Sequence, residues 1–147
     1  MIYNIKEVKT ACNQTLRAAF PDITVYDGDT FDGYKRPSFF TDLRTSRIKD
    51  AKYQTRHAMS FIVTYFEITH SEAHCFDVYE AIFAAFNPFV KVNKKKLIVE
   101  SIDMQFIDEE NDKLQVTIRF ADVLELGGNS ESAEIMQSVD VEIESEV

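Results

Sequence analysis

Two histidines and a cysteine near the middle of the chain are the residues whose types and spacing are most capable of chemistry. His70 and His74 are four positions apart, so on a helix they would share one face and could bind zinc. Cys75 comes next, but about a quarter-turn away, on the apolar side of that helix, where a buried thiol is inert. Neither an HExxH motif nor a third ligand at a usual spacing accompanies them. We therefore predict that these residues are structural and that the chain has no metal site.

A group of three aspartates, Asp27, Asp29 and Asp32 in the segment YDGDTFDG, resembles the start of a calcium-binding loop. Such a loop needs a glutamate at its twelfth position, which here is Ser38. The aspartates are therefore predicted to lie in a solvated turn. The chain also contains no P-loop, no GxSxG motif and no glycine pattern of a dinucleotide-binding protein. We expect no enzymatic activity, no catalytic residue and no cofactor.

A strand followed by a helix, Tyr53–Ile68 and then Thr69–Phe86, must position the histidines and the cysteine. The strand has a continuously apolar face from Met59 onward, which is typical of a central strand packed on helices. Thr69 and Glu72 fit a capping box, so the helix is predicted to begin there. This pair is the predicted centre of the fold.

The predicted helix has an unusually wide apolar face. One stripe recurs at helical spacing from Cys75 to Phe86, and Phe76 and Phe83 form a second stripe beside it. A helix that is apolar over so wide an arc either is deeply buried or packs on a partner molecule. Both alternatives follow equally from the spacing.

The remaining elements predict an α+β fold, a mostly antiparallel sheet of four to five strands with two main helices packed on it. Proline or a turn signal ends most segments, and the last two strands form a hairpin with clear alternation of apolar and polar residues. The predicted helices cover 2–20 and 69–86, and the predicted strands cover 23–26, 38–45, 53–68, 97–107 and 114–120. Residues 46–52 and 91–96 are predicted to be connections. One domain is expected over 1–126, followed by an acidic C-terminal arm over 127–147.

Composition excludes several classes of protein. The 147 residues, of which 45% are hydrophobic, can bury a core without disulfides. Cys12 and Cys75 fall on apolar helix faces, so we expect two buried, reduced thiols. The charged N-terminus is not a signal peptide, and no apolar stretch is long enough to span a membrane. We expect folding in a cytoplasm and no membrane partner.

The net charge of −9 is distributed unevenly along the chain. The last 21 residues hold six acidic residues and no basic residue. Because nucleic-acid binders usually carry a basic face, no specific nucleic-acid binding is expected. The segment 44–56, in contrast, holds five bases and one acid, and it is either a solvated hairpin tip or a contact surface for something acidic. The arm alternates apolar with acidic residues over 138–144, so it either frays or adds to a neighbouring subunit.

Four segments together resemble the small tail terminator (tail-completion) proteins of long-tailed phages and prophages. They are FPDITVY after the first helix, RPSFFTDL, MSFIVTYFEI and LQVTIRFADVLEL. The resemblance covers roughly 1–126, and its motifs are structural. It implies a virion tail protein, assembled in the host cytoplasm, that forms a ring, usually a hexamer. Such a ring caps the tail tube, stops its polymerisation and presents the surface that docks to the head.

The resemblance implies partners of several kinds: further copies of the chain, the tail tube protein, a head-side connector and the sheath, with DNA passing through the ring. The alternatives are another phage or contractile-injection component, such as a head–tail connector or tube protein, and a small enzyme or ligand-binding protein. We expect the subunit interface to draw on the basic segment, the second helical stripe and the arm. Its candidate residues are Arg44, Arg47, Lys49, Lys52, Arg56, Phe76, Phe83, Glu134, Val139, Val141 and Ile143.

Overall fold

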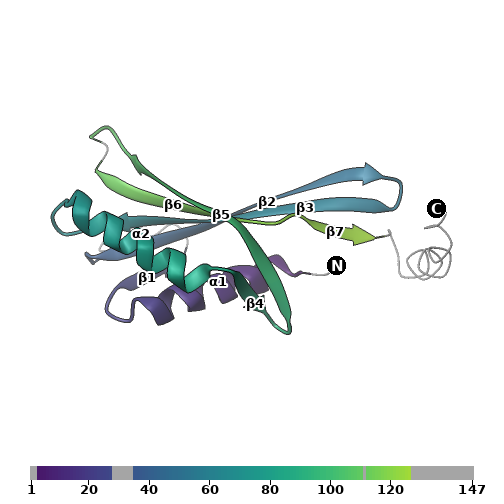
Figure 1. Ribbon diagram of the computed structural model, residues 1–147, viewed down its shortest axis with the longest axis horizontal. Coiled ribbons are helices and arrows are strands. Elements are labelled where there is room, and N and C mark those ends of the chain that lie inside the picture. The colour runs from purple at the N-terminus through teal and green to yellow at the C-terminus, as the bar shows by residue number, and fades with distance from the viewer. Residues whose placement is uncertain (1–2, 28–34, 111, 127–147) are drawn as a thin grey trace. The chain divides into compact units, whose positions relative to one another are not determined.

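The computed structural model describes residues 3–27, 35–110 and 112–126, which form two α-helices and seven β-strands (Figure 1). The helices are α1 (Ile5–Ala19) and α2 (Glu72–Phe86). The strands are β1 (Thr24–Asp27), β2 (Ser38–Ala51), β3 (Gln54–Phe66), β4 (Phe89–Val92), β5 (Lys95–Ile107), β6 (Lys113–Phe120) and β7 (Val123–Leu126). The α+β class is confirmed, but the predicted four to five strands are too few.

The described residues divide into two compact units, and each is treated by itself. The larger unit comprises 3–44 and 59–121, apart from the gaps given above, and the smaller unit comprises 45–58 and 122–126. Strands β2 and β3 contribute residues to both units. The prediction of one domain over 1–126, with a separate arm over 127–147, stays a prediction.

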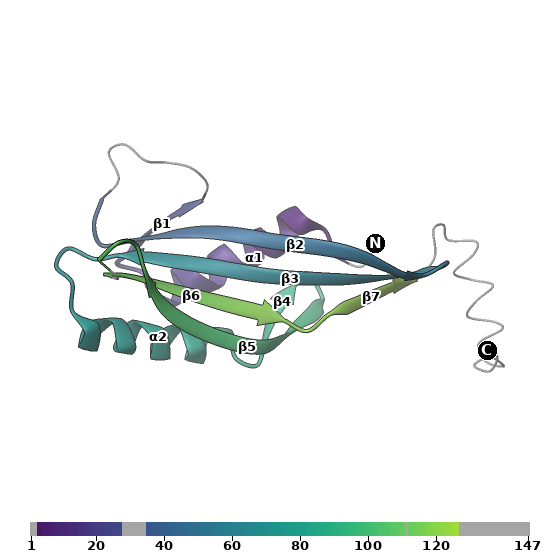
Figure 2. The same ribbon diagram turned by 90° about the horizontal axis from the view of Figure 1, so that it is seen from above.

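The strands of the larger unit follow the order β1-β2-β3-β6-β5-β4 (Figure 2). β1 runs parallel to β2, whereas the β3–β6, β6–β5 and β5–β4 pairs are antiparallel, which confirms the mostly antiparallel sheet. Strand β6 is buried at every second residue, from Leu114 to Phe120, because successive side chains of a strand point to opposite faces. In the smaller unit, β7 pairs antiparallel with β3, with Gln54 opposite Leu126.

Both helices cover the same face of the sheet in the larger unit (Figure 1). Helix α1 packs on α2, β1 and β4, and α2 packs on β5. In the core, Phe61 of β3 stacks on Phe86 of α2, with 5.9 Å between the ring centroids and neither residue exposed. Neither helix in the described part of the chain is both long and apolar enough to cross a membrane.

The ends of α1 follow from its sequence. The Asn4 side chain accepts hydrogen bonds from the backbone N–H groups of Lys6 and Glu7, which caps the first turn. The helix ends at Ala19 because Phe20 precedes Pro21, and the residue before a proline is pushed out of the helical region. The predicted range of 2–20 is close to this.

The predicted capping box of α2 is wrong. The cap is Ser71, in an extended conformation, and its hydroxyl oxygen accepts the backbone N–H of His74 at 3.3 Å. Thr69 therefore lies outside the helix. The start is displaced because the Glu67 carboxylate holds the backbone N–H of Ser71 at 3.2 Å, which fixes the connection before the helix.

Two predicted connections also differ from the structure. Residues 46–51 continue strand β2, and 89–92 form strand β4, so neither segment is the polar connection that its charges indicated. The last predicted strand, 114–120, matches β6, and β7 is a further strand beyond it that was not predicted. The exposed residues 46–49 need no apolar alternation, and the four residues of β4 are too few to show it clearly, so a search for alternation overlooks both.

Candidate assembly surfaces and a polar cluster

The outer face of α2 carries two exposed aromatic side chains. Phe76 is 46% exposed and Phe83 is 41% exposed, and residues seven apart lie on one side of a helix, two turns from each other. The Phe76 ring also lies 6.4 Å from that of Phe106 on β5. Deep burial of the second stripe is therefore wrong, and a partner surface remains the prediction.

Two bases of the segment 44–56 have acidic partners within the smaller unit. The guanidinium Nε of Arg47 lies 3.7 Å from Oε1 of Glu125, and that of Arg56 lies 3.9 Å from Oδ2 of Asp122. Both acids belong to the segment 122–126, which pairs with β3. Such partly exposed pairs contribute little to stability, but they reduce the charge that these two bases offer to another molecule.

The other bases of this segment are exposed. Lys49 lies on β2, and the Lys52 ammonium lies 5.2 Å from the centre of the Tyr53 ring. Arg44 belongs to the larger unit, where its Nε lies 3.9 Å from Oδ2 of Asp42. The predicted arm residues Glu134, Val139, Val141 and Ile143 lie outside the described residues.

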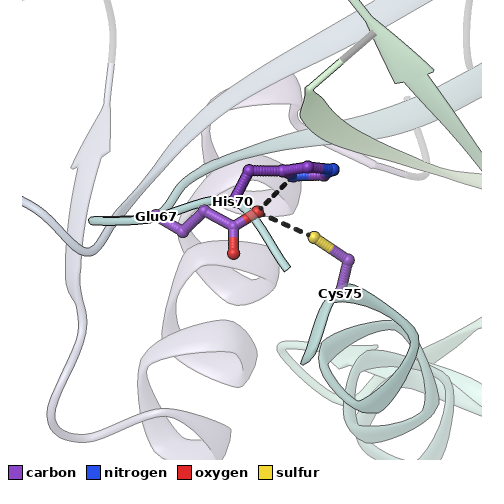
Figure 3. A group of neighbouring side chains, drawn as sticks. All are labelled: Glu67, His70 and Cys75. Atoms are coloured by element: carbon purple, nitrogen blue, oxygen red, sulfur yellow. Dashed lines mark hydrogen bonds and ion pairs between the residues drawn. The ribbon is translucent and has the colours of Figure 1, made fainter. Parts of the chain in front are cut away.

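A polar cluster forms where the chain passes from β3 into α2 (Figure 3). The Glu67 carboxylate is almost fully buried, and its Oε2 lies 2.9 Å from Nδ1 of His70. The Cys75 thiol donates to the same Oε2 at 3.0 Å. The backbone N–H of Ser71 donates to the other oxygen, Oε1. One buried carboxylate thus joins the connection to the first turn of the helix.

The two histidines of this region have different partners. Nε2 of His74 lies 2.9 Å from the Tyr65 hydroxyl, so the i, i+4 pair does not converge on one point. Burial, and then the hydrogen bond to Glu67, raise the pKa of Cys75 to about 12, while burial and the Glu67 charge raise the pKa of Tyr65. Both groups are therefore protonated at neutral pH, and the thiol is inert as a nucleophile.

Sequence reasoning missed Glu67, the residue that brings this cluster together. It directly follows β3 and precedes His70 by three residues, so a search restricted to the helix did not include it. An acidic residue four positions before a serine that can cap a helix, here Ser71, is the sequence signal that could have identified it.

The predicted solvated turn is only partly described. Asp27 is exposed and pairs with Lys9 of α1 at 2.6 Å, which links β1 to the helix. Asp29 and Asp32 lie outside the described residues. Asp27 therefore has a structural partner of its own. The expected thiols are confirmed, because Cys12 and Cys75 are both free and buried.

One family model matches most of the chain. It is described as phage tail terminator protein, and it matches residues 7–136. No curated protein matches the sequence.

Two solved structures resemble the chain in fold. One chain in the virion of a native gene transfer agent particle has a TM-score of 0.57 at 12% identity, and the alignment covers 85% of this chain and 99% of that one. The sheath/tube terminator of an extracellular contractile injection system, in its extended state, has a TM-score of 0.44 at 16% identity, with 88% and 59% covered. The first likeness supports the fold described above.

Proposed function

Since the chain belongs to the phage tail terminator protein family and its place is the virion tail, we propose that it forms a closed ring that caps the tail tube. The ring, of six subunits by analogy with the family, ends polymerisation of the tube protein. Its other side docks to a head-side connector, and its rim contacts the sheath where one is present. The family match over residues 7–136 is the observation that carries this proposal.

The exposed face of α2 supports a contact between subunits. Phe76 and Phe83 each keep more than two fifths of their surface in water. Covering such a half-exposed aromatic ring is worth about 1 kcal/mol, because burial of apolar surface contributes about 25 cal/mol per Å². Repeated at every contact of a closed ring, this gain favours the assembled form over separate subunits.

Charge supports the passage of DNA through such a ring without binding. The chain carries a net charge of −9, so phosphate is repelled by the protein as a whole. A ring that held DNA tightly would impede its transfer from head to host. Because the chain is acidic overall, a basic segment such as 44–56 is one of the few places where an acidic segment would be attracted.

The acidic arm is proposed to contact the basic segment of the neighbouring subunit. All five bases of that segment, Lys49 and Lys52 among them, are exposed, but the three arginines already face acids of their own chain. We expect the two lysines to supply most of the attraction. The apolar residues Val139, Val141 and Ile143 would then lie along the same neighbour.

Native mass spectrometry and negative-stain microscopy test the ring, with and without purified tail tubes. The full chain should form closed rings of uniform mass and bind at tube ends, where it stops growth. Open stacks of subunits would identify a tube protein instead. A monomer that does not bind to tube ends would overturn the proposal.

Deleting 129–147 tests the arm, and we expect it to abolish rings. A full-length variant with all six arm acids changed to glutamine is the matched control, because it keeps the length and loses the charge. Loss of rings in both variants would identify the charge as the cause. If the truncated chain still forms normal rings, the arm is not part of the interface.

A further inference from the structure

The polar cluster at the start of α2 brings three possible metal ligands together. Three side chains of different chemistry, a carboxylate, an imidazole and a thiol, each offer one ligand atom, and these atoms all lie within 4.8 Å of one another (Figure 3). Glu67 contributes Oε2, His70 contributes Nδ1 and Cys75 contributes Sγ. We propose that Glu67, His70 and Cys75 form a binding site for a divalent transition-metal ion, with Zn²⁺ as the preferred ion.

The distances fit such an ion. Zinc binds sulfur at about 2.3 Å and nitrogen or oxygen at about 2.0–2.2 Å, so tetrahedral ligand atoms lie about 3.5 Å apart. Oε2 of Glu67 is 2.9 Å from Nδ1 of His70 and 3.0 Å from Sγ of Cys75. These two contacts need to open by about half an ångström, and the separation of Nδ1 and Sγ, which is within 4.8 Å, needs to be about 3.5 Å. A change of this size is within the reach of side-chain rotation.

The kinds of ligand select the metal. Thiolate and imidazole are ligands of zinc and similar transition ions, whereas calcium and magnesium need sites built from oxygen. The site has three protein ligands, so a fourth position is left for water, as in open zinc sites. Next to Glu67 and His70 lies a cavity of about 100 Å³, with Arg36 and Lys113 also on its wall, which has room for water on this side of the cluster.

Binding replaces a proton by the ion. At neutral pH the Cys75 thiol is protonated and donates to Glu67. On binding, the S–H bond breaks, the sulfur–zinc bond forms, and the proton passes to the buffer. The proton that Nδ1 of His70 shares with Glu67 in the metal-free form moves to Nε2, so that the ring binds through the lone pair of Nδ1. No change of oxidation state is involved.

The ion would join the connection after β3 to the first turn of α2. Glu67 and His70 precede the Ser71 cap, and Cys75 follows it within the helix. Metal binding should therefore raise the thermal stability of the folded chain, because the ion binds the folded form only. This inference is independent of the proposed role in the tail.

Anaerobic titration with Co²⁺ tests the site, since cobalt coordinated by a thiolate gives a charge-transfer band in the near ultraviolet. The full chain, kept in a reductant that contains no thiol, should bind one Co²⁺ with this band, and Zn²⁺ should displace it. Cys75→Ser should lose the band. His70→Ala should weaken binding by more than the roughly 10- to 100-fold loss that follows removal of an outer-shell partner.

Two variants serve as matched controls. Cys12→Ser removes the other buried thiol, and His74→Ala removes the neighbouring histidine, which contacts Tyr65. Both should keep the band and the affinity. His70 is 39% exposed, so His70→Ala should fold even if Cys75→Ser does not, and the Cys12→Ser spectrum then assigns the band to Cys75. Circular dichroism checks each fold.

Three outcomes would overturn the proposal. They are no stoichiometric binding to the full chain, a bound cobalt spectrum without the thiolate band, and full binding by His70→Ala or by a folded Cys75→Ser. Any of them would show that the cluster is a hydrogen-bonded network only. In that case Glu67 serves to fix the start of α2.

Discussion

His57 is a fully buried histidine whose two ring nitrogens have unequal surroundings within the smaller unit. Nε2 lies 2.6 Å from the Thr45 hydroxyl. Nδ1 and Oε2 of Glu125 are 3.7 Å apart, and in the described part of the chain neither atom has a hydrogen-bond partner. Burial and the nearby Arg47 lower the pKa of His57, and the Glu125 charge opposes this shift. The neutral imidazole is thus the folded form.

This arrangement predicts a loss of stability in mild acid. A free histidine has a pKa of about 6.5, and the folded pKa of His57 is lower, so below about pH 6.5 the unfolded chain binds more protons than the folded chain. The free energy of unfolding should therefore fall as the pH falls through this window. Urea unfolding at about pH 7.5 and about pH 5.5 measures the loss, which should be smaller in His57→Gln than in the unaltered chain.

His74→Gln is the matched control, because that histidine is exposed on α2. It reports how far the removal of a histidine outside the smaller unit changes the pH dependence. If His57→Gln shows the same pH dependence as His74→Gln and the unaltered chain, protonation of His57 does not contribute.

At the level of the helices and strands, the spacing of apolar residues predicted the elements whose apolar face is buried in the core. The alternation from Leu114 to Phe120 gave β6, and the helical spacing between Val8 and Leu16 gave α1, because both elements bury one face. The apolar face that such an element packs into the core is visible in its own sequence. These elements could therefore be predicted from the sequence alone.

Other elements could not be predicted in this way. Residues 46–51 read SRIKDA and have no apolar face, yet they extend β2, because backbone pairing makes the strand. β4 was hidden in a basic run after Pro88, although Val90 and Val92 are buried. The polar cluster was missed for a related reason, since Glu67 meets Cys75 only when the chain turns into α2.

The start of α2 yields a prediction for helix capping. Ser71→Ala should lower the free energy of unfolding by about 1 kcal/mol, because the backbone N–H of His74 loses its acceptor. Thr69→Ala is the matched control and should change stability by less than about 0.5 kcal/mol, as exposed substitutions usually do. Urea unfolding of the two variants compares them. A larger loss in Thr69→Ala would restore the capping box at Thr69 and Glu72.

For the whole molecule, the proposed ring gives the two faces of α2 different roles, one in the core and one in a subunit contact. Phe86 has no exposed surface and stacks on Phe61, whereas Phe83 points outward three residues earlier. The same residue type therefore serves the core at one position and is free for a partner at the other. This contrast allows the ring proposal to be tested without disturbing the fold.

Phe83→Asp should abolish the ring and leave a folded subunit. A carboxylate in an apolar subunit contact would lose its water without gaining a partner, whereas on the free subunit it stays hydrated. Native mass spectrometry should find monomers, with a urea midpoint near that of the unaltered chain. Phe86→Ala is the reverse control, expected to lose about 3–5 kcal/mol of stability because it leaves a core cavity. Normal rings in Phe83→Asp would exclude this face of α2 as a subunit contact.

The burial of both thiols has a practical consequence for following assembly in real time. Cys12 and Cys75 are the two cysteines of the chain, and both are buried with pKa values raised to about 12. A maleimide dye at neutral pH needs an accessible thiolate, and the folded subunit offers none. A single cysteine added on its surface would then carry the only fluorophore, so the arrival of individual subunits at a growing tube end could be counted.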